Sequence, residues 1–232
     1  MNKLRNTLIA AISVAFLSTS AFAGSFGIGA AGSLAAIGAS GTETEGTAAD
    51  TSNNTATASN NTYVGSVFAE YTFDNGFTIG ADWIPGSADV NSKKLSRQDT
   101  ELSEQDDDIP DNDTATRTAS AEVENHITYY AELPLGGSGL YAKAGYVQMD
   151  VNTTEKLHET SKYGNDTVDG MVIGLGFKVD SGSNWYYKLE ANHTEFDSMT
   201  LKSTGNASES SANTIKADLD VTKATFALGY KF

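Results

Sequence analysis

The sequence predicts an all-β protein, specifically an eight-stranded antiparallel up-and-down transmembrane β-barrel. Three observations predict this fold class. Eight segments alternate between apolar and polar residues with a period of two, the links between them are alternately short and long, and the last strand ends on an aromatic residue. Strands with an apolar outer face and a small or charged inner face suit a closed sheet that is surrounded by lipid.

The eight predicted strands have boundaries that are accurate to a few residues. The first strand is the weakest, because glycine and alanine dominate both of its faces, and the last is the clearest. The outward and inward residues that justify the other strands and the last are, in chain order, Tyr71 and Glu70, Ile79 and Asp82, Leu133 and Glu132, Ala144 and Lys143, Phe177 and Lys178, Leu189 and Lys188, and Tyr230 and Lys231. The predicted strands span 24–38, 62–73, 77–90, 120–134, 140–151, 168–179, 184–197 and 214–232.

The links between these strands predict the topology. The links 74–76, 136–139 and 180–183 are rich in Gly, Asn, Asp and Ser, which tolerate positive φ in tight turns. The long links are polar, and they span 39–61, 91–119, 152–167 and 198–213. Short and long links therefore lie at opposite ends of the barrel. The sequence leaves open whether the long links form hairpins that extend the strands.

Two irregularities interrupt the alternation. Pro85 and Gly86 predict a bulge or bend near one rim. Ile215, Leu219 and Val221 alternate in the opposite phase to the last nine residues. This reversal predicts either a bulge near Thr222 or an extension of the strand beyond the membrane, and the sequence does not choose between them.

Composition excludes several classes of function. The formal net charge of −15 argues against a nucleic-acid partner and favours divalent cations. The chain contains no cysteine, which excludes disulfides, thiolate chemistry and cysteine-ligated zinc. The mean hydropathy of −0.30 fits a barrel with alternating strands and polar loops. A soluble lipocalin-like barrel would require the opposite arrangement, with its apolar residues inside.

The N-terminal segment predicts export. Lys3 and Arg5 precede an apolar run over 8–17, and Ala21-Phe22-Ala23 provides a cleavage site of A-x-A type. We expect residues 1–23 to be a cleaved signal peptide and residues 24–232 to be one barrel domain. The alternative, a membrane anchor, is disfavoured because the run is shorter than the roughly 20 residues that a spanning helix needs.

Charged residues on the inward faces form a predicted lumen network. Such charges are expected to pair, since an unpaired buried charge is costly. A structural network that fills the barrel is favoured over a conduction pathway, because eight strands leave an interior that side chains just fill. The predicted members are Glu70, Asp82, Glu132, Lys143, Lys178, Lys188, Glu190 and Lys231.

No catalytic, cofactor or metal site is predicted. His126, His158 and His193 lack a neighbouring nucleophile motif, although Glu124 and His126 are expected to share a strand face. The acidic run over 104–113 could hold Ca²⁺ or Mg²⁺, but it lacks the spacing of a calcium loop and is better explained as a solvated loop.

Aromatic residues gather near the short turns, as in an interfacial girdle. They are Phe26, Phe73, Phe77, Phe177, Trp185, Tyr230 and Phe232. With the signal peptide, the period-two strands and the terminal aromatic, the chain resembles the small eight-stranded outer-membrane family typified by the OmpA transmembrane domain, OmpX and the opacity proteins.

The resemblance implies an integral outer-membrane protein of Gram-negative bacteria, in contact with lipid and lipopolysaccharide. It also implies that Tyr230 and Phe232 are recognised by the barrel-insertion machinery. We expect a structural or surface-interaction role carried by four long acidic and polar extracellular loops. The alternative is a narrow or gated porin-like channel. An outer-membrane enzyme is a remote alternative.

Overall fold

The computed structural model describes residues 24–47, 50–90, 95–102, 112–154, 162–204 and 213–232. Its strands are β1 (Gly24–Thr47), β2 (Asp50–Phe73), β3 (Thr78–Asp89), β4 (Leu95–Leu102), β5 (Asn112–Ala119), β6 (Ala121–Pro134), β7 (Leu140–Thr153), β8 (Asp166–Asp180), β9 (Trp185–Phe196), β10 (Met199–Lys202) and β11 (Thr214–Lys231). The described residues include no helix that is long and apolar enough to cross a membrane.

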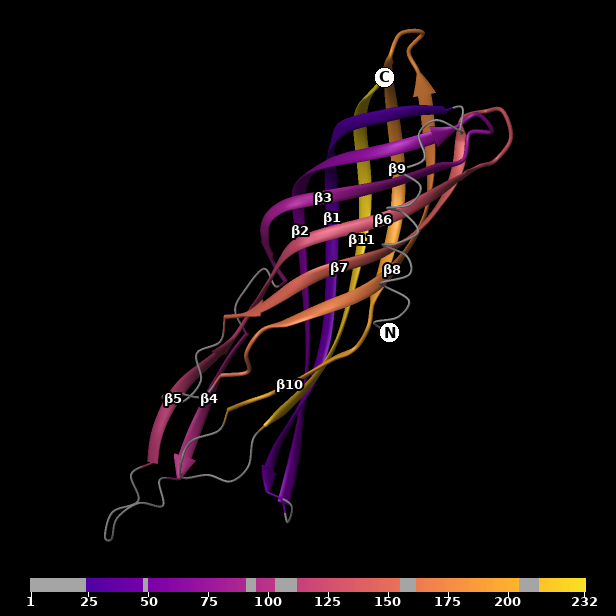
Figure 1. Cartoon of the computed structure of the whole chain (residues 1–232). Coiled ribbons are helices and arrows are strands. Elements are labelled where there is room, and N and C mark those ends of the chain that lie inside the picture. Colours follow the sequence, from indigo (N-terminus) through magenta and orange to yellow (C-terminus); the bar gives the residue numbers. More distant parts are fainter. Residues whose placement is uncertain (1–23, 48–49, 91–94, 103–111, 155–161, 205–212) are drawn as a thin grey trace.

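Eight of the described strands form a closed antiparallel ring in the order β1-β2-β3-β6-β7-β8-β9-β11 (Figure 1). The ring closes where β1 pairs with β11, in a register that runs unbroken from Gly27 opposite Lys231 to Thr44 opposite Thr214. Closure leaves no free sheet edge, so every strand finds backbone partners laterally. The predicted fold class is confirmed.

The three short links are tight turns. In the first, the Gly76 amide donates to the Phe73 carbonyl at 2.8 Å, and Gly76 has a φ of 83°. The Asn75 side chain accepts a hydrogen bond from the Phe77 amide at 3.0 Å. Positive φ favours glycine at this position, which explains why the Asp-Asn-Gly sequence turns the chain.

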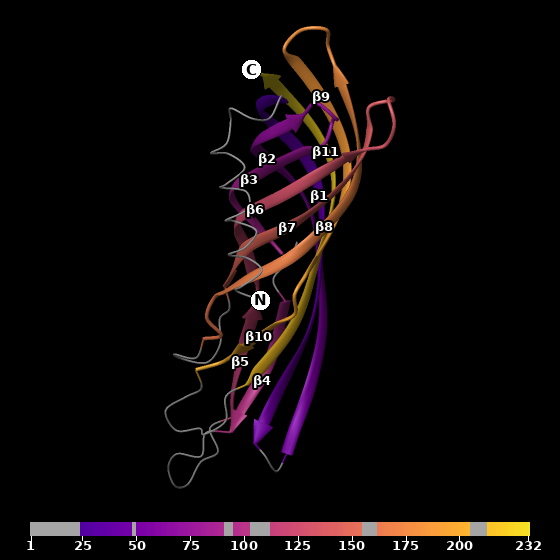
Figure 2. The ribbon, with the colours of Figure 1, turned by 45° about the vertical axis from the view of Figure 1, so that its right-hand side comes forward.

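The strands at the opposite end extend beyond the predicted bounds. β1 and β2 continue as one hairpin to Thr47 and Asp50, so most of the predicted link 39–61 is strand. β4 and β5 form a second hairpin within 91–119, and β10 lies within 198–213 and pairs with β11. Figures 1 and 2 show the β1–β2 and β4–β5 hairpins projecting from the same end of the ring. We call this the long-loop end.

Two bulges adjust the register near the long-loop end. One is the bulge predicted at Pro85-Gly86, where the pairing of β3 with β6 shifts between Ile84 and Ser87. The other is at Asn125, which has a φ of 52° and lies where the pairing of β6 with β7 shifts. The bulge at Pro85-Gly86 is confirmed, whereas the one at Asn125 was not predicted.

The phase reversal on β11 is an extension and not a bulge. The register of β11 with β9 is continuous from Asp220 to Tyr230, so the bulge predicted as an alternative near Thr222 is wrong. Side chains keep alternating, but the chemistry of the two faces is exchanged. Phe226 points outward in the lower part of β11, whereas above Ala224 the outward residues are polar and Val221 is buried inside.

The same exchange occurs at the same level on β1, since Leu34 pairs with Ala224. Leu34 is 48% exposed on the outside, whereas Ala35 and Ile37 are buried inside. An apolar exterior is stable in hydrocarbon and a polar exterior is stable in water. The pair Leu34 and Ala224 therefore marks the edge of the lipid-facing band. Beyond it β1 continues for 13 residues to Thr47, or roughly 40 Å along the strand at about 3.3 Å per residue.

Candidate functional site

Lys188 lies at the centre of a buried ion-pair cluster in the half of the lumen nearest the short turns. Its ammonium group contacts Glu70 and lies 2.7 Å from one carboxylate oxygen of Glu132 and 2.9 Å from the other. Lys178 donates to the second oxygen of Glu70 at 3.1 Å. Lys188, Glu70 and Glu132 are almost fully buried. The cluster joins β2, β6, β8 and β9 across the lumen.

A second ion pair extends this cluster. The Lys143 ammonium lies 2.8 Å from Glu190, whose carboxylate also accepts hydrogen bonds from the Tyr141 hydroxyl at 2.6 Å and from the Asn192 amide at 2.9 Å. The Tyr130 hydroxyl donates to Glu70 at 2.9 Å. We call Glu70, Glu132, Glu190, Lys143, Lys178 and Lys188 the central cluster. Its three carboxylates and three ammonium groups balance in charge, which allows their burial.

Three tyrosines fill the space around the central cluster, and each faces an inward glycine. Lys143 lies 3.9 Å from the centre of one of these rings and Lys178 lies 4.3 Å from another, so cation–π contacts add to the ion pairs. A Cβ on any of these glycines would come within 2.6 Å of a ring atom. The pairs are Tyr186 with Gly229, Tyr141 with Gly176, and Tyr130 with Gly80.

The sequence analysis did not name Tyr141 or Tyr186 among the lumen residues. The signal that could have found them is their spacing, since each lies two residues before an inward lysine, Lys143 or Lys188. Tyr186 is fully buried. An aromatic ring inside a charged lumen is therefore part of the packing that excludes water.

The other two predicted network residues lie apart from the central cluster. Asp82 accepts a hydrogen bond from the Ser66 hydroxyl at 2.7 Å. Lys231 lies 2.6 Å from Asp180 at the rim of the short turns, where both side chains are partly exposed. Lys223 is a further inward cation that the sequence analysis did not name, and Asp82 is the charged group that acts on it most strongly.

The histidines do not form a common site in the described residues. His126 faces the lumen, and neither of its ring nitrogens has a hydrogen-bond partner there. His193 is on the outside of β9, with its Nδ1 2.9 Å from the Thr222 hydroxyl. The expectation that Glu124 and His126 share a face is wrong. The bulge at Asn125 reverses the alternation, so that Glu124 bonds to the outward Asn152 at 2.5 Å.

The predicted acidic run lies outside the described residues over 103–111, and His158 lies outside them as well. In the part of the chain that the structure describes, no group of three acidic or histidine side chains could hold a metal ion.

A layer of apolar side chains lies above the central cluster, toward the long-loop end. Its residues come from β1, β7, β8, β9 and β11, among other segments, and Val147 and Met149 in it have no exposed surface. We call this layer the apolar plug. Its central members are Ala35, Ile37, Val147, Met149, Val168, Val172, Phe196, Leu219 and Val221. Ions are poorly solvated among such side chains, so the plug and the central cluster form two successive barriers in the lumen.

The aromatic residues of the short-turn end pack side by side on the outside of the ring. Tyr230 packs edge to face against Trp185 at 5.1 Å and against Phe232 at 5.2 Å between ring centres. Phe232 also lies 6.2 Å from Phe26 on the neighbouring strand. Amphipathic rings at this level suit the boundary between lipid and water.

A closed antiparallel ring with a lipid-compatible exterior and paired charges inside defines a membrane-spanning β-barrel. The comparison with protein families gives the narrower assignment. Residues 9–232 match the model of the outer membrane protein beta-barrel domain, so the chain belongs to that family. The protein is thus a bacterial outer-membrane protein. No curated protein matches the sequence closely enough to count as a relative.

Several solved structures resemble the fold. The outer membrane protein OprG from Pseudomonas aeruginosa is 12% identical, with 91% of this chain and 97% of that chain covered and a TM-score of 0.49. Neisserial surface protein A is 10% identical, with 89% and 97% covered and a TM-score of 0.40. The outer membrane protease OmpT from Escherichia coli is 9% identical, with 93% and 100% covered and a TM-score of 0.47.

Proposed function

We propose that the protein is a non-conducting outer-membrane barrel whose long-loop end interacts with molecules at the cell surface. The observation that carries this proposal is the division of the molecule at the level of Leu34 and Ala224. Below this level the lumen holds the central cluster, and above it the strands continue as a structure with a polar exterior. A filled barrel anchors a projecting structure and does not need to transport anything.

The orientation of the barrel in the membrane is part of the proposal. Bacterial barrels have short periplasmic turns and long extracellular loops. We therefore expect the short turns to face the periplasm and the β1–β2 and β4–β5 hairpins to face the medium. The acidic balance of the chain favours cationic or polar partners, including divalent cations that bridge to lipopolysaccharide.

Two further parts of the proposal concern export and assembly. We expect residues 1–23 to be removed as a signal peptide, and Tyr230 and Phe232 to be recognised by the insertion machinery. Replacing Phe232 with Ala should lower the fraction of folded protein in the outer membrane. Replacing Phe226, an outward aromatic of the same strand, is the matched control.

An epitope insertion tests the orientation. We expect an epitope inserted between Thr47 and Asp50 to bind antibody on intact cells, whereas an epitope inserted within 136–139 binds only after the outer membrane is permeabilised. The opposite pattern would reverse the topology and remove the surface role.

Conductance in planar bilayers tests the alternative, a narrow channel. A channel would require both the central cluster and the apolar plug to move aside. We expect no stable unitary currents from the purified protein. Steady currents that change when Lys188 or Glu190 is replaced by Ala would refute the non-conducting role and support the channel.

A further inference from the structure

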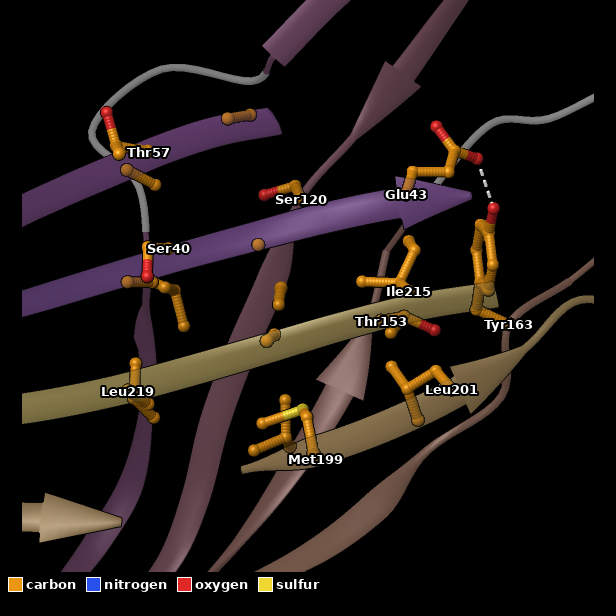
Figure 3. A pocket seen from close by; sticks show the side chains of 18 of the residues that line it. Ser40, Glu43, Thr57, Ser120, Thr153, Tyr163, Met199, Leu201, Ile215 and Leu219 are labelled. Carbon is orange, nitrogen blue, oxygen red and sulfur yellow. Dashed lines mark hydrogen bonds between the residues drawn. The ribbon is translucent and has the colours of Figure 1, made fainter. Parts of the chain in front are cut away.

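A cavity of about 450 Å³ lies inside the long-loop end, above the apolar plug. It is enclosed on one side by β1, β2, β10 and β11 and on the other by residues at the ends of β4 to β7 (Figure 3). Its inner surface is mostly aliphatic, with Val151, Met199, Leu201, Ile215 and Leu219 among its lining residues. The volume falls within the roughly 300 to 1,000 Å³ typical of pockets for small molecules.

The position of the cavity is unusual for an apolar surface. At this level the outside of β11 carries Lys216 and Asp218, so the wall separates the cavity from water and not from lipid. Interiors of proteins are normally packed with side chains, and water is a poor occupant of an aliphatic space. Side chains fill the neighbouring apolar plug in this way, whereas Ile215 and Ala217 border open space. These observations indicate a binding site for an apolar molecule.

The charge of the lining restricts the chemistry of that molecule. Glu43 lies at the rim and accepts a hydrogen bond from the Tyr163 hydroxyl, as the dashed line in Figure 3 marks. The charged residues among the described lining are acidic, Glu43 and Asp218. A carboxylate or phosphate would be repelled there. Hydroxyl groups of Ser120 and Thr153 are available to an uncharged polar end.

We propose that this cavity binds a neutral lipophile, namely a molecule with an alkyl body and an uncharged polar end such as a hydroxyl. The site is a dead end, because the apolar plug and the central cluster close the lumen below it. The inference goes beyond the proposed surface role. Binding here does not depend on which partner the loops contact, and it does not require conduction.

Photolabelling tests the site in the full mature chain, reconstituted in lipid nanodiscs. The probe is a long-chain alkanol that carries a diazirine, and labelled positions are mapped by peptide mass spectrometry. We expect labelling at Met199 and Leu201 that unlabelled alkanol competes away. Labelling of lipid-facing residues such as Leu189 should not saturate, which separates the cavity from the bilayer.

A pair of alanine variants on β1 provides the matched control. Ala39 lines the cavity, whereas Ala36 lies on the outside of the same strand. Ala39→Trp should fill the cavity and reduce the competable labelling roughly tenfold, a loss of about 1.4 kcal/mol in binding free energy. Ala36→Trp should leave it unchanged. If Ala39→Trp does not fold, Ala217→Phe fills the same cavity from β11.

Competition by charged analogues tests the assigned chemistry. A fatty acid of the same chain length should compete far more weakly than the alkanol, and Glu43→Gln should narrow that difference. Labelling that does not saturate at Met199 and Leu201, equal labelling in Ala39→Trp and Ala36→Trp, or equal competition by the fatty acid would each overturn the proposal. None of these results bears on the conductance or epitope tests of the proposed function.

Discussion

Single residues in the lumen act through charge balance and through space. Lys188 is the one residue of the central cluster that contacts two carboxylates, Glu70 and Glu132, at the same time. Gly229 leaves the room that the ring of Tyr186 occupies. Both roles can be tested by substitutions that have a matched control elsewhere in the chain.

Replacing Lys188 with Met should destabilise the barrel by about 3 to 5 kcal/mol, because it leaves Glu70 and Glu132 buried without their shared cation. Unfolding by urea in detergent micelles measures this loss. Lys231→Met is the control, since Lys231 pairs with the exposed Asp180 at the rim and should cost about 1 kcal/mol or less. Equal losses for the two variants would mean that the central cluster does not support the fold.

Replacing Gly229 with Ala should also destabilise the barrel, by about 1 to 3 kcal/mol. The new Cβ would lie 2.2 Å from a ring carbon of Tyr186, which is fully buried and has no room to move. Gly32→Ala is the control, because a Cβ at Gly32 meets no atom within 4 Å. The same urea titration compares both variants, and a neutral Gly229→Ala would contradict the packing described for the lumen.

At the scale of one element, β11 is a single strand that meets two solvents. Its outward residues are apolar from Phe226 to Phe232, and they are polar from Lys216 to Asp220. Because its register with β1 and β9 is unbroken, no bulge turns the side chains around. The environment around the strand changes along its length, and the sequence changes with it.

Spin labels on β11 should locate this change of solvent. The chain has no native cysteine, so single cysteine variants can be labelled directly. A label at position 226 should be relaxed mainly by oxygen, which concentrates in lipid, and a label at position 218 should be relaxed mainly by a water-soluble nickel complex. The two accessibilities should cross near Ala224. A crossing nearer to Lys216 would mean that the membrane covers more of the strand.

At the scale of the whole molecule, the ring, the central cluster and the projecting hairpins divide the protein into a membrane part and an aqueous part. The membrane part needs a closed sheet, because backbone groups have no water partners in hydrocarbon. The aqueous part has the opposite arrangement, with apolar residues such as Leu219 and Val221 inside. One closed sheet therefore serves both environments.

Export of the whole molecule gives a further prediction. Protein extracted from the outer-membrane fraction should begin at Gly24, because the A-x-A site ends at Ala23. N-terminal sequencing checks this. Ala23→Lys should block cleavage and leave the precursor in the inner-membrane fraction. A mature chain that keeps Lys3 and Arg5 would mean that the segment is not a cleaved signal.

Periodicity and turn chemistry determined the ring, because side chains on a strand alternate whatever their partners are. Glu70, Glu132 and Lys188 could be placed inside from this pattern alone. Which charges touch was decided only by the tertiary structure, since β2, β6 and β9 are brought together by closure and stagger. The Asn125 bulge and the space inside the long-loop end also depended on distant strands. A period of two specifies a face, whereas the neighbour across a lumen is specified by three-dimensional packing.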